Sequence, residues 1–179
     1  MVRNGPVRFQ LAINLDRPHI DCNVCLCSAR SVVPRFDWNA EPRLLRFLPG
    51  AQEAWFPRDC FDGWCLPVTP ASDRMGLRLR GEPLPLPGRE MVSEPACPGT
   101  VQVTHDGQCI VLGVDGQTIG GYPKIAQVVS ADLDKLGQLR PGDLVTFRRV
   151  SVAEAESLYR RKRAELHDWL LRLRVAEDF

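Results

Sequence analysis

Short apolar runs, separated by proline and glycine, recur along the chain from residue 41 to residue 150. Residues 77–80 alternate apolar with charged side chains, which is typical of a strand with one buried face. The clearest hairpin joins residues 100–104 to residues 108–112 through Asp106 and Gly107, a pair that favours a tight turn. The pattern predicts a mostly β domain, with further strands at residues 44–48, 122–130 and 143–150.

Two segments have helical periodicity instead. Residues 131–139 predict a short helix, and Ser151 with Glu154 has the spacing of a capping box that starts a long helix running to about Val175. Its apolar residues recur at helical spacing and predict a face that docks on the β domain or on a partner. These residues are Ala155, Leu158, Tyr159, Leu166, Trp169, Leu170 and Leu173.

The chain therefore divides into residues 1–40, which receive no assignment, a β domain at 41–150, and a helix with a tail at 151–179. A net charge of +1 provides no basic field for nucleic acid. The apolar stretches are far shorter than the roughly 20 residues of a membrane-spanning helix. We expect a cytoplasmic protein with no nucleic-acid or membrane partner, because the N-terminus also lacks the pattern of a secretory signal.

The seven cysteines are an odd number and cannot pair completely within one chain, so reduced thiols are expected. Cys22 and Cys25 have the spacing of zinc ligands, but no second such pair follows and the chain has only three histidines. No metal site is predicted.

Candidate chemistry is densest in the loop at residues 115–124. The adjacent Gly120 and Gly121 allow close approach of a ligand and can cradle an anion with backbone N–H groups, while Lys124 adds a cation.

Four polar side chains of this loop complete the candidate site. Asp115 can orient a hydroxyl group or water, Gln117 and Thr118 can hydrogen-bond an amide, and Tyr122 offers a phenol or a stacking face. An ordinary glycine-rich turn with an exposed lysine is the alternative.

A second polar group precedes the strand at residues 77–80. Arg74 can clamp a carboxylate or phosphate, with Asp73 holding its guanidinium group, and Glu94 can face the same cleft. A purely structural Asp73–Arg74 pair is the alternative here.

Six segments in the same order closely resemble one family, the KipA-type C subunit of bacterial 5-oxoprolinase. This family is related to the carboxyltransferase part of biotin-dependent urea carboxylase and to proteins called allophanate hydrolase subunit 2. The segments are residues 45–56, 72–79, 93–103, 106–112, 115–133 and 136–147.

The resemblance implies a cyclophilin-like β-barrel with short helices and a long C-terminal helix. It also implies a cytosolic complex with a KipI-like B subunit plus an A subunit, which opens 5-oxo-L-proline to L-glutamate with ATP used at the level of the complex. A small amide or carboxylate would be the substrate, and Lys124, Asp115 and Tyr122 are the catalytic candidates.

Two departures from the family's sequence pattern leave alternative functions open. Gly116 stands where the family usually has an arginine, and the family's N-terminal motifs are not found before Leu44. The alternatives are a biotin-dependent carboxyltransferase acting on urea or a similar amide, and a truncated binding or regulatory module without catalysis. We do not expect this chain to turn over substrate alone.

Overall fold

The computed structural model describes residues 43–58, 60–86, 88–89 and 91–177, with side chains up to residue 171. The chain divides into two units, residues 1–36 and 37–179, and the described residues belong to the second. Expectations about residues 1–40, including the cysteines at 22, 25 and 27, lie outside them.

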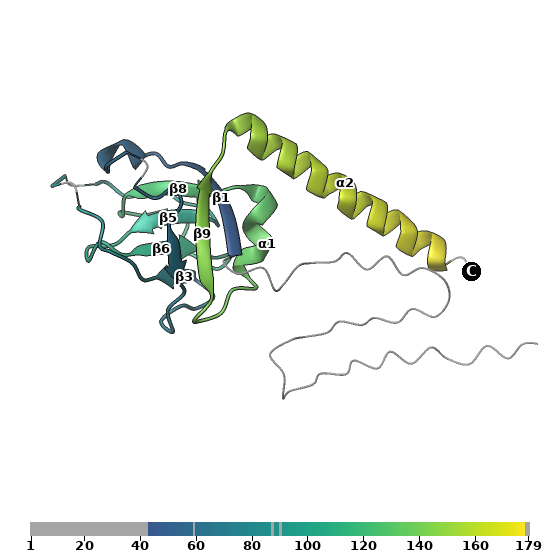
Figure 1. The fold of residues 1–179 in the computed structure, drawn as a ribbon, viewed down its shortest axis with the longest axis horizontal. Coiled ribbons are helices and arrows are strands. Elements are labelled where there is room, and N and C mark those ends of the chain that lie inside the picture. The colour runs from purple at the N-terminus through teal and green to yellow at the C-terminus, as the bar shows by residue number, and fades with distance from the viewer. Residues whose placement is uncertain (1–42, 59, 87, 90, 178–179) are drawn as a thin grey trace, which may run out of the picture. The chain divides into compact units, whose positions relative to one another are not determined.

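Nine strands and a long helix make up the described unit (Figure 1). The elements are β1 (Arg43–Pro49), η1 (Glu53–Trp55), β2 (Cys65–Pro67), β3 (Gly76–Leu79), β4 (Glu94–Pro95), β5 (Thr100–Val103), β6 (Cys109–Leu112), β7 (Ile119–Gly120), β8 (Lys124–Val128), η2 (Ser130–Asp132), α1 (Leu133–Leu136), β9 (Leu144–Arg149) and α2 (Val152–Glu177).

Seven strands form one sheet in the order β2-β9-β1-β8-β5-β6-β3, in which β1 and β9 run parallel. The two edges meet, because Val68 after β2 forms a bridge with Leu79 of β3. Thr69 N donates to the Arg78 carbonyl at 2.8 Å and Arg80 N to the Pro67 carbonyl at 3.1 Å. This closure confirms the expected β-barrel.

Local sequence explains the turns of the barrel. In β3, Leu77 and Leu79 are buried and Arg78 is exposed, as the alternation predicted. Gly107 closes the β5–β6 hairpin with a φ of 76°, and Gly142 has a φ of 94° in the turn before β9. Because side chains other than glycine rarely adopt these angles, glycine fixes both turns.

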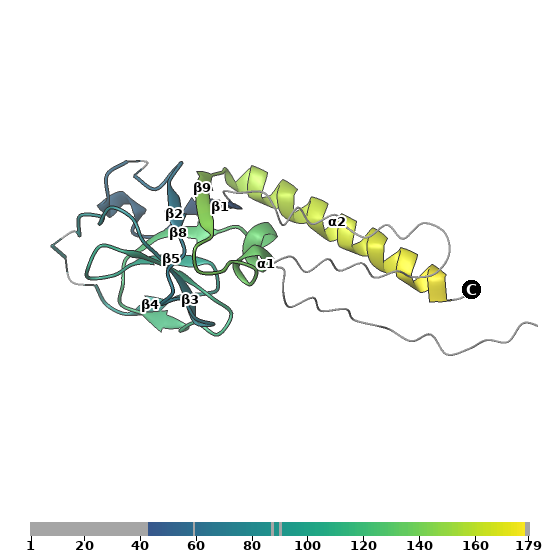
Figure 2. The same ribbon diagram turned by 60° about the horizontal axis from the view of Figure 1, so that its bottom comes forward.

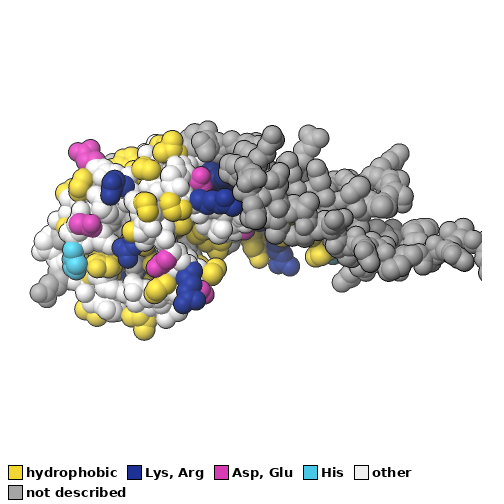
Figure 3. All heavy atoms as spheres, turned by 90° about the horizontal axis from the view of Figure 1, so that it is seen from below, with side chains coloured by type: hydrophobic (Ala, Val, Ile, Leu, Met, Phe, Trp, Pro, Cys, Tyr) yellow, Lys and Arg dark blue, Asp and Glu magenta, His cyan; other side chains and the backbone are white. Residues whose placement is uncertain are grey.

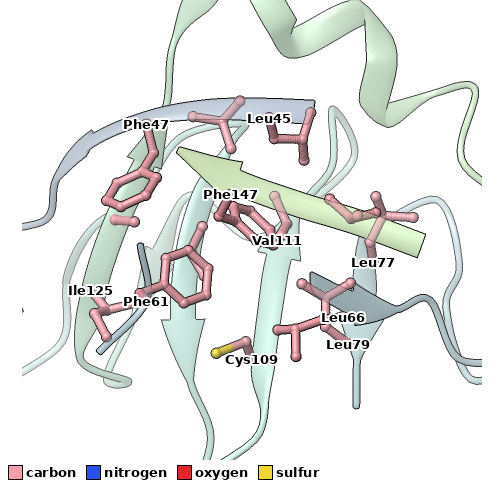
Figure 4. Packing of buried hydrophobic residues seen from close by; sticks show 14 of the residues in the cluster. Leu45, Phe47, Phe61, Leu66, Leu77, Leu79, Cys109, Val111, Ile125 and Phe147 are labelled. Atoms are coloured by element: carbon pink, nitrogen blue, oxygen red, sulfur yellow. The ribbon is translucent and has the colours of Figure 1, made fainter. Parts of the chain in front are cut away.

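Aliphatic and aromatic side chains fill the barrel (Figure 4). The ring of Phe61 lies 4.3 Å from Phe147 and 5.4 Å from Phe47, measured between centroids. Val101 and Val111 are fully buried and oppose each other on β5 and β6.

The helix α2 begins where the sequence predicted. Glu154 N donates to Ser151 Oγ at 3.1 Å, but the Glu154 carboxylate pairs with Arg148 at 3.2 Å, so one half of the capping box is present. Ala155 and Leu158 pack against the small cluster of Val129, Ala131 and Val150. Farther along, Leu166 and Leu170 are exposed, so only the start of the apolar face docks on the β domain, and docking of the rest on a partner stays a prediction. No helix in the described part is long and apolar enough to cross a membrane.

Candidate functional site

β4 and β7 form a two-stranded ribbon separate from the seven-stranded sheet, and Figure 2 labels β4 beside β3. Glu94 pairs with Gly120 and Pro95 with Ile119 across it. The fully buried Val101 and Val103 point into the barrel, so Gln102 between them points outward, toward the ribbon.

Lys124 is the most buried charged residue of the predicted loop. Its side chain is 8% exposed and its Nζ lies 3.3 Å from Glu94 Oε2. Gln52 ties both residues together, because its Nε2 donates to Glu94 at 3.0 Å and its Oε1 accepts from Lys124 N at 3.0 Å. We call these three residues the lysine cluster.

A cavity of about 280 Å³ lies beside the lysine cluster. Lys124 lines it together with Thr100, Gln127 and Gly50. A Cβ atom at Gly50 would lie 2.2 Å from the Lys124 carbonyl oxygen, so a glycine is needed where this loop meets β8. Thr100 Oγ1 donates to Gln127 Oε1 at 2.8 Å and Gln127 Nε2 donates to the Pro98 carbonyl at 2.9 Å, so Lys124 is the group of this cavity that suits a carboxylate or the oxygen of an amide.

A second cavity, of about 150 Å³, lies beside β7. Gln102, Gln117 and Tyr122 line it with Arg78 and Asp73. The edge of Tyr122 faces His105, with ring centroids 5.0 Å apart. The loop predicted as one site thus contributes to two cavities, with Lys124 in the larger and Gln117 and Tyr122 in the smaller.

The predicted partner of Arg74 is wrong. Asp73 Oδ1 accepts hydrogen bonds from Met75 N at 2.9 Å and Gly76 N at 3.2 Å, so it stabilises the turn before β3. The Arg74 guanidinium group instead lies 3.9 Å from Asp115, and the two side chains are 84% and 54% exposed. Such an exposed pair contributes little energy, and neither Arg74 nor Asp115 lines either cavity.

The remaining loop residues act through the backbone. The Thr118 carbonyl accepts from Ala96 N at 2.8 Å and extends the ribbon. A Cβ at Gly120 would lie 2.7 Å from the amide nitrogens of Gln102 and Gln117, whereas one at Gly121 would lie 3.5 Å from Ser93 Oγ. Gly120 therefore provides close approach.

Reasoning from the sequence missed Gln52 and Gln102 as site residues. Both stand in segments that carry the family resemblance, 45–56 and 93–103, and both are buried polar residues, 6% and 1% exposed. Their place in these segments was the available signal, since neither sits in the glycine-rich loop.

Of the cysteines in the described ranges, Cys65, Cys97 and Cys109 are free thiols. Burial raises the pKa of the Cys109 thiol to about 12, so it stays protonated at neutral pH. Among the residues that the structure describes, no group of three or more His, Cys, Asp or Glu side chains is close enough to hold a metal ion.

Figure 3 shows acidic and basic side chains interspersed on one face of the described unit, without a basic patch.

The chain is similar to a family model, to two curated relatives and to solved structures, all of the carboxyltransferase or 5-oxoprolinase type. The family model described as carboxyltransferase domain, subdomain A and B, matches residues 10–149, a range that includes most of the unassigned N-terminal segment. The chain is 42% identical over 122 residues to a Haemophilus influenzae protein named as the C subunit of 5-oxoprolinase. It is 43% identical over 115 residues to an Escherichia coli protein of the same name.

These alignments take in 66% and 62% of the chain but only 40% and 37% of the two relatives, so the chain spans less than half the length of either. A crystal structure of the Kluyveromyces lactis urea carboxylase matches 70% of the chain and 12% of its own, with a TM-score of 0.65. Its sequence identity is 23%, so this likeness concerns the fold alone.

Proposed function

Because this chain belongs to the family of carboxyltransferase domains with subdomains A and B, we propose that it is a component of an ATP-dependent 5-oxoprolinase, equivalent to part of that enzyme's C subunit. The complex would open 5-oxo-L-proline to L-glutamate. The observation that carries the proposal is the 42% and 43% identity to two proteins named as the C subunit of 5-oxoprolinase.

The larger cavity supports a small anionic amide as the substrate. Lys124 is held by Glu94 and Gln52, so its ammonium group is positioned before a ligand arrives. A preorganised cation in a partly buried site stabilises negative charge on a carboxylate or on the oxygen of an attacked amide. Glu94 is 45% exposed and close enough to exchange a proton with Lys124 or with water.

ATP enters this proposal through the resemblance to 5-oxoprolinase, at the level of the complex as a whole, and we derive no step through it. The partners proposed are a KipI-like B subunit together with an A subunit, in the cytoplasm.

Reconstitution tests this function. The full chain, mixed with its A- and B-type partners, should convert 5-oxo-L-proline to L-glutamate with consumption of ATP. Lys124→Met should lower kcat/KM at least about 100-fold, because the loss of a preorganised charge contact costs about 3 kcal/mol in the transition state. Lys162→Met is the matched control, since Lys162 Nζ bonds the Ala131 carbonyl at 2.7 Å and pairs with the half-exposed Asp134, and Lys162 lines neither cavity.

Other outcomes decide between the alternatives. Stable association with the B-type partner without turnover would replace the proposal with the binding module. Carboxylation of urea by carboxybiotin, without lactam opening, would favour the carboxyltransferase. Turnover that Lys124→Met leaves unchanged would remove the lysine cluster from the mechanism.

A further inference from the structure

The amide of Gln102 is a buried polar group with an unused donor. The residue is 1% exposed and lies on β5 beneath the β4–β7 ribbon. Gln102 Oε1 accepts a hydrogen bond from Gln117 Nε2 at 3.3 Å, whereas Gln102 Nε2 has no partner among the described residues. Buried side-chain donors are rarely left unpaired, so each exception needs an explanation.

The surroundings of this amide leave room for a ligand. Gln102 lines the smaller cavity, whose volume of about 150 Å³ exceeds the share of a single water molecule. Gln117, which covers the amide, has an exposed side chain and can move aside. Ile110 and Leu112 add apolar surface to the cavity.

The backbone of β7 passes directly over the amide. Gly120 of β7 approaches Gln102 so closely that a Cβ atom there would lie 2.7 Å from Gln102 Nε2. Arg78 and Asp73 line the same cavity. The donor and the acceptor of the Gln102 amide therefore face a small space that both charged residues border.

We propose that Gln102 recognises a cis amide, such as a lactam, through two parallel hydrogen bonds. The ligand N–H would replace Gln117 as donor to Gln102 Oε1, and the ligand carbonyl would accept from Gln102 Nε2. A primary carboxamide has its donor and acceptor on one edge, and only an amide with N–H and C=O on the same side matches it. The smaller cavity is a site separate from the larger one beside Lys124, so recognition of a cis amide here does not rest on the proposed function.

Direct binding to the full chain tests this inference without turnover. Side-chain amide signals of Gln102 and Gln117 are followed by NMR during titration with 2-pyrrolidinone, N-methyl-2-pyrrolidinone, L-proline and 5-oxo-L-proline. The two lactams with a free N–H should shift both signals to saturation. N-methylation should weaken binding about tenfold or more, because one hydrogen bond is lost and Gln102 Oε1 is left unpaired. L-proline lacks the lactam carbonyl and should not bind.

Variants separate recognition from folding. Gln102→Met should abolish the shifts while leaving the melting temperature unchanged or higher, since it removes an unpaired buried donor. Gln108→Met is the matched control: both polar atoms of Gln108 are paired with Gly81, so it should melt lower and bind normally. Gly120→Ala keeps Gln102 but pushes its amide away, and it should also weaken binding.

The outcomes remain distinguishable from those of the proposed function. Equal binding of the N-methylated lactam, normal binding by Gln102→Met, or no shift with any lactam would each overturn the inference. Lactam binding without reconstituted turnover would uphold the inference and count against the oxoprolinase proposal.

Discussion

Asp132 shows how a buried charge is stabilised in this fold. Its side chain is fully buried and lies 2.5 Å from Arg46 Nη2 and 2.8 Å from Lys135 Nζ. Arg46 N and Nε also donate to its Oδ2, at 2.9 and 2.8 Å. Burial alone would raise the pKa of Asp132, but the hydrogen bonds and charges of Arg46 and Lys135 outweigh it, and the pKa is lowered.

We predict that Asp132→Asn lowers the free energy of unfolding by about 3 kcal/mol or more at pH 7, because it leaves Arg46 without its buried counter-ion. A carboxyl group with a lowered folded pKa stabilises the protein above its unfolded pKa of about 3.9, and this stabilisation is lost as the pH falls through the folded pKa. The difference between wild type and variant in urea unfolding should therefore be full at pH 6 and shrink toward pH 3. A constant difference over that range would contradict the assignment.

The site illustrates which residues a sequence can reveal. Lys124 and the paired glycines stand out because unusual residue types gather in one short loop. Gln52 does not, because its role depends on Glu94, which lies 42 positions away and meets it only after the ribbon has formed. The predicted pairing of Arg74 with Asp73 was wrong because adjacency in sequence does not decide which group a carboxylate binds. Asp73 accepts hydrogen bonds from backbone N–H groups of its own turn.

Single strands and helices were easier to predict from the sequence than the pairing between them. Alternation in β3, the glycine of the β5–β6 hairpin and the serine before α2 are local signals, and each marks a boundary that the structure confirms. The ribbon was not predicted, because β4 and β7 are two residues long and exist only by pairing with each other. Barrel closure between β2 and β3 likewise has no local signature.

At the start of α2, we predict that Ser151→Ala lowers the free energy of unfolding by about 1 kcal/mol, because the hydroxyl oxygen accepts from Glu154 N. Thermal unfolding and hydrogen exchange of the first helical amides measure the loss. Ser157→Ala, at an exposed position in the second turn of the helix, should be neutral or stabilising, since alanine is the better helix former. Equal losses in the two variants would argue against a capping role.

The whole barrel depends on a few large side chains. Phe147 is fully buried on β9 and contacts Phe61, whose ring also lies 6.0 Å from Trp64. We predict that Phe147→Ala lowers the free energy of unfolding by about 3–5 kcal/mol, a large part of the roughly 5–15 kcal/mol that holds a domain folded.

Urea unfolding followed by tryptophan fluorescence tests this prediction. Phe147→Leu is the control, because it retains much of the apolar volume and should lose less stability. If both variants unfold at the same urea concentration, the aromatic cluster does not hold the two sides of the barrel together.

The parallel pairing of β1 with β9 also governs the order in which the protein can fold during its synthesis. Leu45 is paired with Phe147, about a hundred residues later in the chain. A ribosome adding 5–20 residues per second needs roughly 5–20 s to supply that partner. The β5–β6 hairpin can close as soon as both strands are synthesised, but the apolar strand at residues 43–49 stays unpaired with β9 in the nascent chain, and unpaired apolar strands are prone to aggregation.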